Sequence, residues 1–138
     1  MSKILFFIGI AILTLNACST DGPDTSEQPK KEEVLYEVKD GKFTEWYPGK
    51  KQVKFEGNVD VKGDREGKWT FYSEKGNMLS FTFYAHGKRE GYSVVKHPNG
   101  RIHYHGEYKN DKMVGVWTTY DANGKNKQEK DYGYPDSE

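Results

Sequence analysis

The feature that most constrains this chain is an internal repeat with a period of 24. Two sets of glycines carry it, and within each set the members recur at that period: Gly67, Gly91 and Gly115, and Gly76, Gly100 and Gly124. Tyr84 and Tyr108 follow the same spacing, and Trp69 and Trp117 lie two periods apart. A period of this length indicates small supersecondary units stacked in a row, because each unit then contacts only its neighbours.

Each unit is predicted to be a β-hairpin. The second glycine set ends polar four-residue segments at 73–76, 97–100 and 121–124, and Asn-Gly supplies the positive φ angles that tight hairpin turns require. Strands are expected on either side of these turns, at 68–72, 78–84, 92–96, 102–108, 116–120 and 125–130. Asp40-Gly41 predicts one more hairpin, between 34–38 and 43–47. The first glycine set, with its polar neighbours, is interpreted as links between hairpins.

The apolar composition excludes folds that need a thick aliphatic core. Beyond position 17 the chain contains only Leu35, Leu79 and Ile102 as Leu or Ile, whereas it has ten Tyr and three Trp. A helical bundle or a doubly wound α/β fold needs many more aliphatic side chains. The sequence therefore predicts an all-β fold, a single-layer antiparallel meander of hairpins over residues 34–133 followed by a tail at 134–138.

The turn length predicts which side chains share a face. If the turn occupies 73–76, then Tyr72 pairs with Asn77 and Trp69 with Ser80, and side chains alternate between the two faces from there. One face is expected to carry Trp69, Phe71, Met78, Tyr84, Val95, Ile102, Tyr104, Tyr108 and Trp117. The other is expected to carry Tyr72, Leu79, Phe81, Phe83, Tyr92, Val94, His103, His105 and Tyr120.

The segment 1–17 is predicted to be a signal peptide. Lys3 precedes a twelve-residue apolar run at 4–15, which is too short to cross a membrane and typical of a signal sequence. The run ends in Leu15-Asn16-Ala17-Cys18, which resembles the lipobox of bacterial lipoproteins. The resemblance implies that Cys18, the chain's one cysteine, is lipidated and anchors the protein in the bacterial cell envelope, at the outer membrane and facing the periplasm or the surface. An ordinary cleaved signal peptide with a chance cysteine is the alternative.

Residues 18–33 are expected to form a flexible tether. Positions 19–33 contain no aliphatic or aromatic side chain, so they cannot bury enough surface to offset the entropy of ordering. The chain's formal net charge is zero, with 21 basic and 21 acidic side chains, which argues against a nucleic-acid partner.

Several segments resemble the MORN-repeat variant family. Trp117-Thr-Thr-Tyr120 followed by Asn123-Gly124-Lys125 matches one part of its unit, and Gly106-Glu107-Tyr108 matches another. The similarity covers about residues 40–130, and the unit with Ser93 and Lys96 at the Trp and Tyr places departs from it. It implies stacked β-hairpins, and some proteins with these repeats are described as antitoxins, which implies a toxin as the partner.

The aromatic side chains are the candidate binding residues. Exposed aromatic patches often mark interaction sites, so a platform for a sugar, a peptide or a lipid headgroup is expected from one face of the sheet. Its members would be Trp69, Tyr84, Tyr104, Tyr108 and Trp117. The alternative is that these rings only hold the sheet together through cross-strand pairs.

No catalytic or metal-binding constellation is predicted. His103 and His105 alternate on one strand with Glu107, but the residues expected opposite them, Val94 and Tyr92, are poor metal ligands. Acidic residues such as Glu66 are interpreted as solvated charges in the links. No cofactor is expected.

The sequence thus favours a lipid-anchored, non-catalytic interaction module for a protein or glycan partner. An antitoxin-like or immunity-like inhibitor of a toxin is one alternative, and a structural spacer is another.

Overall fold

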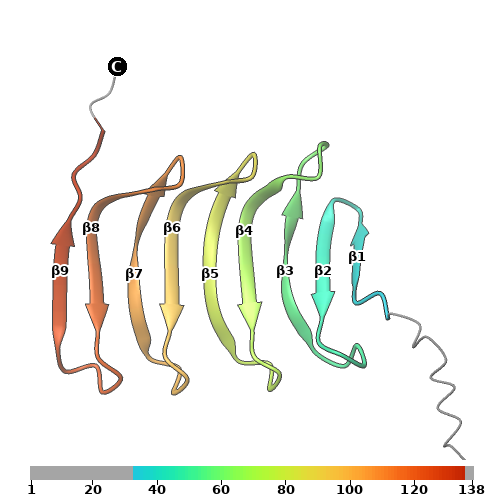
Figure 1. Ribbon diagram of the computed structural model, residues 1–138, viewed down its shortest axis with the longest axis horizontal. Helices are drawn as coiled ribbons and strands as arrows, with labels where there is room; N and C mark the ends of the chain where they lie inside the picture. The colour runs from blue at the N-terminus through green and yellow to red at the C-terminus, as the bar shows by residue number, and fades with distance from the viewer. Residues whose placement is uncertain (1–32, 136–138) are drawn as a thin grey trace, which may run out of the picture. The chain divides into compact units, whose positions relative to one another are not determined.

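The computed structural model describes residues 33–135, and within this range the chain forms one antiparallel sheet (Figure 1). The predicted signal peptide, Cys18 and nearly all of the predicted tether lie outside the described residues, as do residues 136–138. The strands are β1 (Tyr36–Lys39), β2 (Lys42–Trp46), β3 (Val53–Val59), β4 (Arg65–Tyr72), β5 (Met78–Ala85), β6 (Lys88–Lys96), β7 (Ile102–Lys109), β8 (Lys112–Tyr120) and β9 (Lys127–Asp131).

The predicted fold class is confirmed. All nine strands belong to one sheet, and their order in space is their order in the chain, so each strand pairs only with its sequence neighbours. Over these residues, Figure 1 shows a single open layer with no second layer packed on either face. No helix among the described residues is long and apolar enough to cross a membrane.

The turns confirm the predicted hairpins. Asp40 and Gly41 have φ angles of 50° and 74°, so both central residues of this two-residue turn are left-handed, as the Asp-Gly pair predicts. In the turn after β4, Gly76 has φ of 81° and its N–H donates to the carbonyl of Ser73 at 2.9 Å. The turns that end at Gly100 and Gly124 repeat this bond.

The predicted register is wrong by one or two residues, and most side chains keep their predicted face. Ser73 N–H donates to the carbonyl of Asn77, so three residues, 74–76, lie between the bonded ends where four were predicted, and a bulge follows the turn. As a result Tyr72 pairs with Met78, and Trp69 pairs with Thr82 where the sequence predicted Ser80. The difference at Trp69 is two residues, and a shift of two keeps Trp69 on its predicted face. Met78 and Ile102 lie on the opposite face from the one predicted, because the bulges after the turns pair them with Tyr72 and Lys96.

The interpretation of the first glycine set as links is also wrong. Gly67, Gly91 and Gly115 lie inside β4, β6 and β8, where the pairing register shifts and their φ angles are 64°, 98° and 58°. A bulge with a left-handed residue favours glycine because it has no Cβ. The links are short turns at 86–87 and 110–111, and the strands after them start several residues earlier than predicted.

The sheet has almost no conventional core. The buried hydrophobic side chains in the described range are Trp69, Val94, Val114 and Trp117. We call the face that carries Trp69 and Trp117 the Trp face. The opposite face, which carries Phe81 and His105, is called the His face. Rows of rings stabilise both faces: Tyr36, Phe43 and Phe55 stack along the Trp face, and Phe81, Tyr92 and His105 follow one another along the His face.

Candidate functional site

The five predicted binding residues all lie on the Trp face but form two separate clusters. Trp69 and Tyr84 make an edge-to-face contact at the β4–β5 hairpin, with ring centroids 6.4 Å apart. Tyr104 and Tyr108 both contact Trp117 at the β7–β8 hairpin, at 6.0 Å and 4.8 Å. The single continuous platform expected from the sequence is therefore divided into two.

Both tryptophans are buried against a glycine of the neighbouring strand. Trp69 is 2% exposed, its indole lies over Gly57, and its Nε1–H donates to the carbonyl of Asn58 at 2.8 Å. Trp117 is 4% exposed and lies over Gly106 in the same way. A Cβ at either glycine would overlap the indole. These rings therefore hold the hairpins together and do not form exposed stacking surfaces.

The unit between the clusters replaces both partners of this arrangement. Ser93 stands at the tryptophan place and pairs with Thr82, which stands at the glycine place. Their hydroxyl oxygens are 2.7 Å apart and form a hydrogen bond. This unit therefore has two small hydrogen-bonded residues where the other units have an indole over a glycine.

In the N-terminal cluster a cation fills the space between the rings. The guanidinium carbon of Arg65 lies 4.5 Å from the centre of the Trp69 ring and 5.2 Å from that of Tyr84. It also lies 6.0 Å from the rings of Phe55 and Phe71, and its Nη1 donates to the Tyr84 hydroxyl at 3.2 Å. The Arg65 side chain therefore occupies the space between the rings of this cluster.

The C-terminal cluster keeps the arrangement but has no arginine at the repeat position of Arg65. One period after Arg65 stands Arg89, which lies 4.1 Å from the centre of the Tyr108 ring and is held by Asp111 at 3.0 Å. Two periods after Arg65 stands Met113. A cavity of about 490 Å³ opens beside Met113, and it is lined by Tyr104, Tyr108, Met113, Trp117, Thr119, Gln128, Glu129, Lys130 and Tyr132.

The chemistry of this cavity is mixed. Tyrosine rings and a methionine form its apolar part, and burial raises the pKa of the Tyr108 phenol, so this hydroxyl stays protonated at neutral pH. Lys130 adds a positive charge, with its Nζ 4.6 Å from the centre of the Tyr132 ring. Thr119 and Gln128 add polar groups. Apolar walls with a few polar groups are typical of small-molecule sites.

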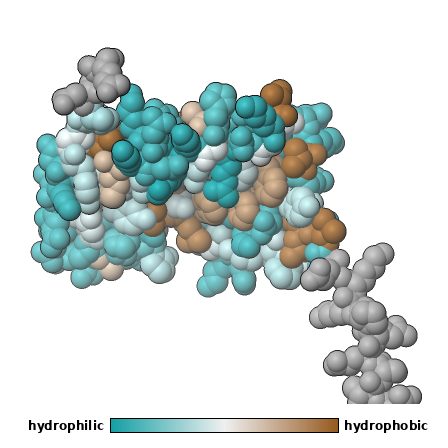
Figure 2. Space-filling view, turned by 45° about the horizontal axis from the view of Figure 1, so that its top comes forward, coloured by the Kyte–Doolittle hydropathy of each residue, from teal (hydrophilic) through white to brown (hydrophobic). Residues whose placement is uncertain are grey.

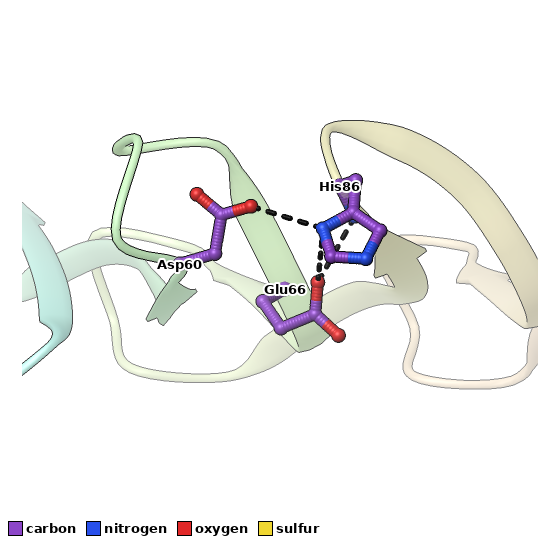
Figure 3. Close-up of side chains that lie close together, drawn as sticks. All are labelled: Asp60, Glu66 and His86. Atoms are coloured by element: carbon purple, nitrogen blue, oxygen red, sulfur yellow. Dashed lines mark hydrogen bonds and ion pairs between the residues drawn. The ribbon is translucent and has the colours of Figure 1, made fainter.

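The structure brings together a second group of side chains that the sequence did not predict. Asp60 follows β3, Glu66 lies at the start of β4, and His86 lies in the turn between β5 and β6. His86 Nδ1 is 3.1 Å from an oxygen of Asp60 and 3.9 Å from one of Glu66 (Figure 3). The hydrogen bond to Asp60, followed by the charge of Glu66, raises the pKa of His86. The bond from His86 in turn lowers the pKa of Asp60. In the described part of the chain, this is the one group of three whose ligand atoms could meet a metal ion.

The repeat accounts for the position of Glu66 in this group without a metal ion. The Glu66 carboxylate accepts the backbone N–H of His86 at 2.9 Å, and one period later Glu90 accepts the N–H of Asn110 at 2.7 Å. Glu66 was expected to be a solvated charge, but it caps the turn between β5 and β6, and Glu90 caps the turn between β7 and β8. The matched spacing of Glu66 with Glu90, and of His86 with Asn110, is the sequence signal that could have revealed these contacts.

The predicted histidine pair is divided between two environments. His105 pairs with Val94, and its Nδ1 lies 2.7 Å from the Tyr92 hydroxyl. His103 instead lies against His97, with ring centres 4.2 Å apart, and His97 Nε2 is 2.9 Å from the carbonyl of Tyr120. The two histidines therefore serve different local contacts.

The comparisons with known proteins give no further assignment: no protein-family model matches this chain, and no curated protein matches it either.

Proposed function

We propose that this chain is a non-catalytic binding module of the bacterial cell envelope, held by a lipid on Cys18, and that the cavity beside Met113 is its binding site. The observation that carries the proposal is the difference between the two aromatic clusters. The N-terminal one is filled by Arg65, whereas the C-terminal one has Met113 at that place and an open cavity of about 490 Å³.

The lining favours a sugar as the ligand. Tyrosine rings at the wall can stack on the apolar face of a sugar ring, and the hydroxyl, amide and ammonium groups of Thr119, Gln128 and Lys130 can bond its hydroxyls. The cavity volume lies within the usual range of small-molecule sites, roughly 300–1,000 Å³. The partner class proposed is therefore a glycan, and a protein side chain is the competing ligand.

The anchor and the family are proposed on sequence grounds. Leu15, Asn16, Ala17 and Cys18 support lipidation, and two or three acyl chains would bind a membrane almost permanently. The repeated hairpins support membership of the variant MORN repeats. A binding module displayed on a lipid would meet glycans of the envelope directly.

A glycan titration tests the binding proposal. NMR shifts of the Thr119, Gln128 and Tyr132 amides are followed while neutral and acidic oligosaccharides are added, one class at a time. A saturable shift confined to the cavity is expected. Shifts absent across the whole panel, or spread evenly over the sheet, would contradict the assignment.

A matched pair of lysine variants adds the control. Lys130 lies over the ring of Tyr132 at the cavity. Lys68 makes the same kind of contact on the His face, where its Nζ lies 4.4 Å from the centre of the Phe81 ring. Lys130→Ala is expected to weaken glycan binding about tenfold, the effect of losing one good polar contact. Lys68→Ala is expected to leave binding unchanged. Equal effects of both variants would show that binding lies elsewhere.

A further inference from the structure

The two edges of the sheet differ in character. The exposed hydrophobic side chains at the β1 end are Val34, Tyr36 and Val38, which are 61%, 56% and 55% exposed. At the other end, β9 is Lys-Gln-Glu-Lys-Asp and entirely exposed. Figure 2 shows hydrophobic surface gathered toward the β1 end on the right, and a largely hydrophilic surface toward β9 on the left. Charged residues protect an edge strand from pairing, so β9 is protected and β1 is not.

Within residues 33–135, the outer backbone groups of β1 have no partner strand and lie beside these apolar side chains. Lys39 and Lys42 close the two-residue turn, and Trp46 N–H donates to the carbonyl of Leu35 at 2.7 Å. In an antiparallel ladder the bonded positions alternate, so residues 35, 37 and 39 point their N–H and C=O groups toward β2. The N–H and C=O groups of Tyr36 and Val38 therefore point outward from the sheet.

The described strands offer one match for the β1 edge. The strands β2 to β8 are paired on both sides, and β9 is charged. Residues 19–33 contain no aliphatic or aromatic side chain and cannot match the apolar alternation of β1. The strand that presents the same alternation and the same free groups is β1 of a second copy.

We propose that two copies pair through their β1 edges in an antiparallel, two-fold symmetric dimer centred on Tyr36. In this register Tyr36 meets its own copy, and Val34 meets Val38 of the second copy, all on the Trp face. The stacked row of Tyr36, Phe43 and Phe55 then continues across the dimer axis. A symmetric edge of this kind closes after two copies and does not propagate into fibres.

The neighbouring registers are less favourable. A register centred on position 37 would place two Glu37 carboxylates opposite each other, which destabilises a strand pair. A register centred on Val38 would place Tyr36 opposite Asp40, which already belongs to the turn with φ of 50°. The register centred on Tyr36 avoids both conflicts and aligns the largest number of apolar side chains.

Cysteine cross-linking tests the register. Residues 32–138 include every strand of the described sheet and contain no cysteine, so one introduced cysteine is unique. In a bonded antiparallel pair the Cα atoms lie about 5.5 Å apart, which suits a disulfide. Tyr36→Cys is therefore expected to form a disulfide dimer at least tenfold faster than Val38→Cys, whose two copies would lie about 13 Å apart. Equal rates would overturn the register.

Backbone substitution tests the edge itself. Val38→Pro removes an outward N–H and leaves the β1–β2 bonds in place, whereas Val38→Thr keeps the N–H. Sedimentation equilibrium of residues 32–138 up to about 1 mM is expected to show a dimer for the parent and Val38→Thr, because short interfaces associate weakly. Val38→Pro, checked for its β-sheet circular dichroism, is expected to stay monomeric. A monomeric parent, or a dimer that survives Val38→Pro, would refute the proposal.

Discussion

The effects of substituting Gly106 and Trp117 on the free energy of unfolding are expected to be strongly coupled. The substitutions replace this pair with the residues that stand at the same places in the preceding unit. The φ angle of Gly106 is not in the left-handed region, so the backbone there would accept a residue with a side chain. A Cβ at this position would instead overlap the indole of Trp117. The counterpart pair is Thr82 with Ser93. The variants are Gly106→Thr, Trp117→Ser and the double substitution, all made in residues 32–138.

The magnitudes follow from the contacts. Gly106→Thr alone forces the indole to move, at about 1–3 kcal/mol for overpacking, and breaks the Trp117 Nε1–H bond to the Glu107 carbonyl, 3.1 Å long, at about 1 kcal/mol. Threonine suits a strand better than glycine and returns up to about 1 kcal/mol, so a net loss of about 2–3 kcal/mol is expected. Trp117→Ser alone is expected to cost about 3–5 kcal/mol, as for other deletions of a buried tryptophan.

In the double variant the added threonine has room and a hydroxyl partner. Gly106→Thr is then expected to be neutral or slightly stabilising, because the clash is gone and a Thr–Ser bond can form as it does at Thr82 and Ser93. The coupling free energy is therefore expected to be about 2–4 kcal/mol, at the upper end for residues in contact. Urea unfolding followed by circular dichroism measures all four proteins. Effects that add to within about 0.5 kcal/mol, as they do for independent sites, would show that the indole does not block a side chain at Gly106.

Three further outcomes are expected. Arg65→Met reproduces the Met113 position and should lower the free energy of unfolding by about 1–2 kcal/mol in urea, because the guanidinium contacts four rings; an unchanged midpoint would contradict this. His86, observed by NMR, should titrate above its usual pKa of 6.5, and Asp60→Asn should return it toward that value. Because the folded-state pKa of His86 is raised, its protonation stabilises the fold just below pH 6.5, where Asp60 is ionised, and this contribution is lost as the pH rises through the raised pKa. The contribution is also lost in acid as Asp60, whose folded-state pKa is lowered, becomes protonated. An identical titration of His86 in Asp60→Asn would exclude the pairing. Cys18→Ala in the full chain should release the protein from the membrane fraction, and a variant that stays bound would disprove the lipid anchor.

The sequence predicts the fold better than it predicts the site. Alternation and the two glycine sets give the strands and the faces, because the period of two and the demand for positive φ are local properties. The bulges at Gly67, Gly91 and Gly115 were missed, since a glycine in a bulge and a glycine in a link look alike in sequence. Their position depends on how two strands pair, which is not local.

For the candidate binding residues, the exposure of the tryptophans is what the sequence did not predict. Trp69 and Trp117 were expected on a platform, but each is covered once a glycine opposite lets the ring lie flat. The clearest difference between the clusters, Arg65 against Met113, was present in the repeat alignment. It gained meaning only when the structure showed Arg65 among four rings.

The central claim is that residues 33–135 form one open layer in which strands pair only with their sequence neighbours. Backbone cross-strand nuclear Overhauser effects of residues 32–138 test it most directly. The account predicts contacts between Trp69 and Thr82, between Ser93 and Thr82 and between Trp117 and Lys130, in the observed register. Contacts that join β1 to β9 within one molecule, or strands that are not sequence neighbours, would contradict it.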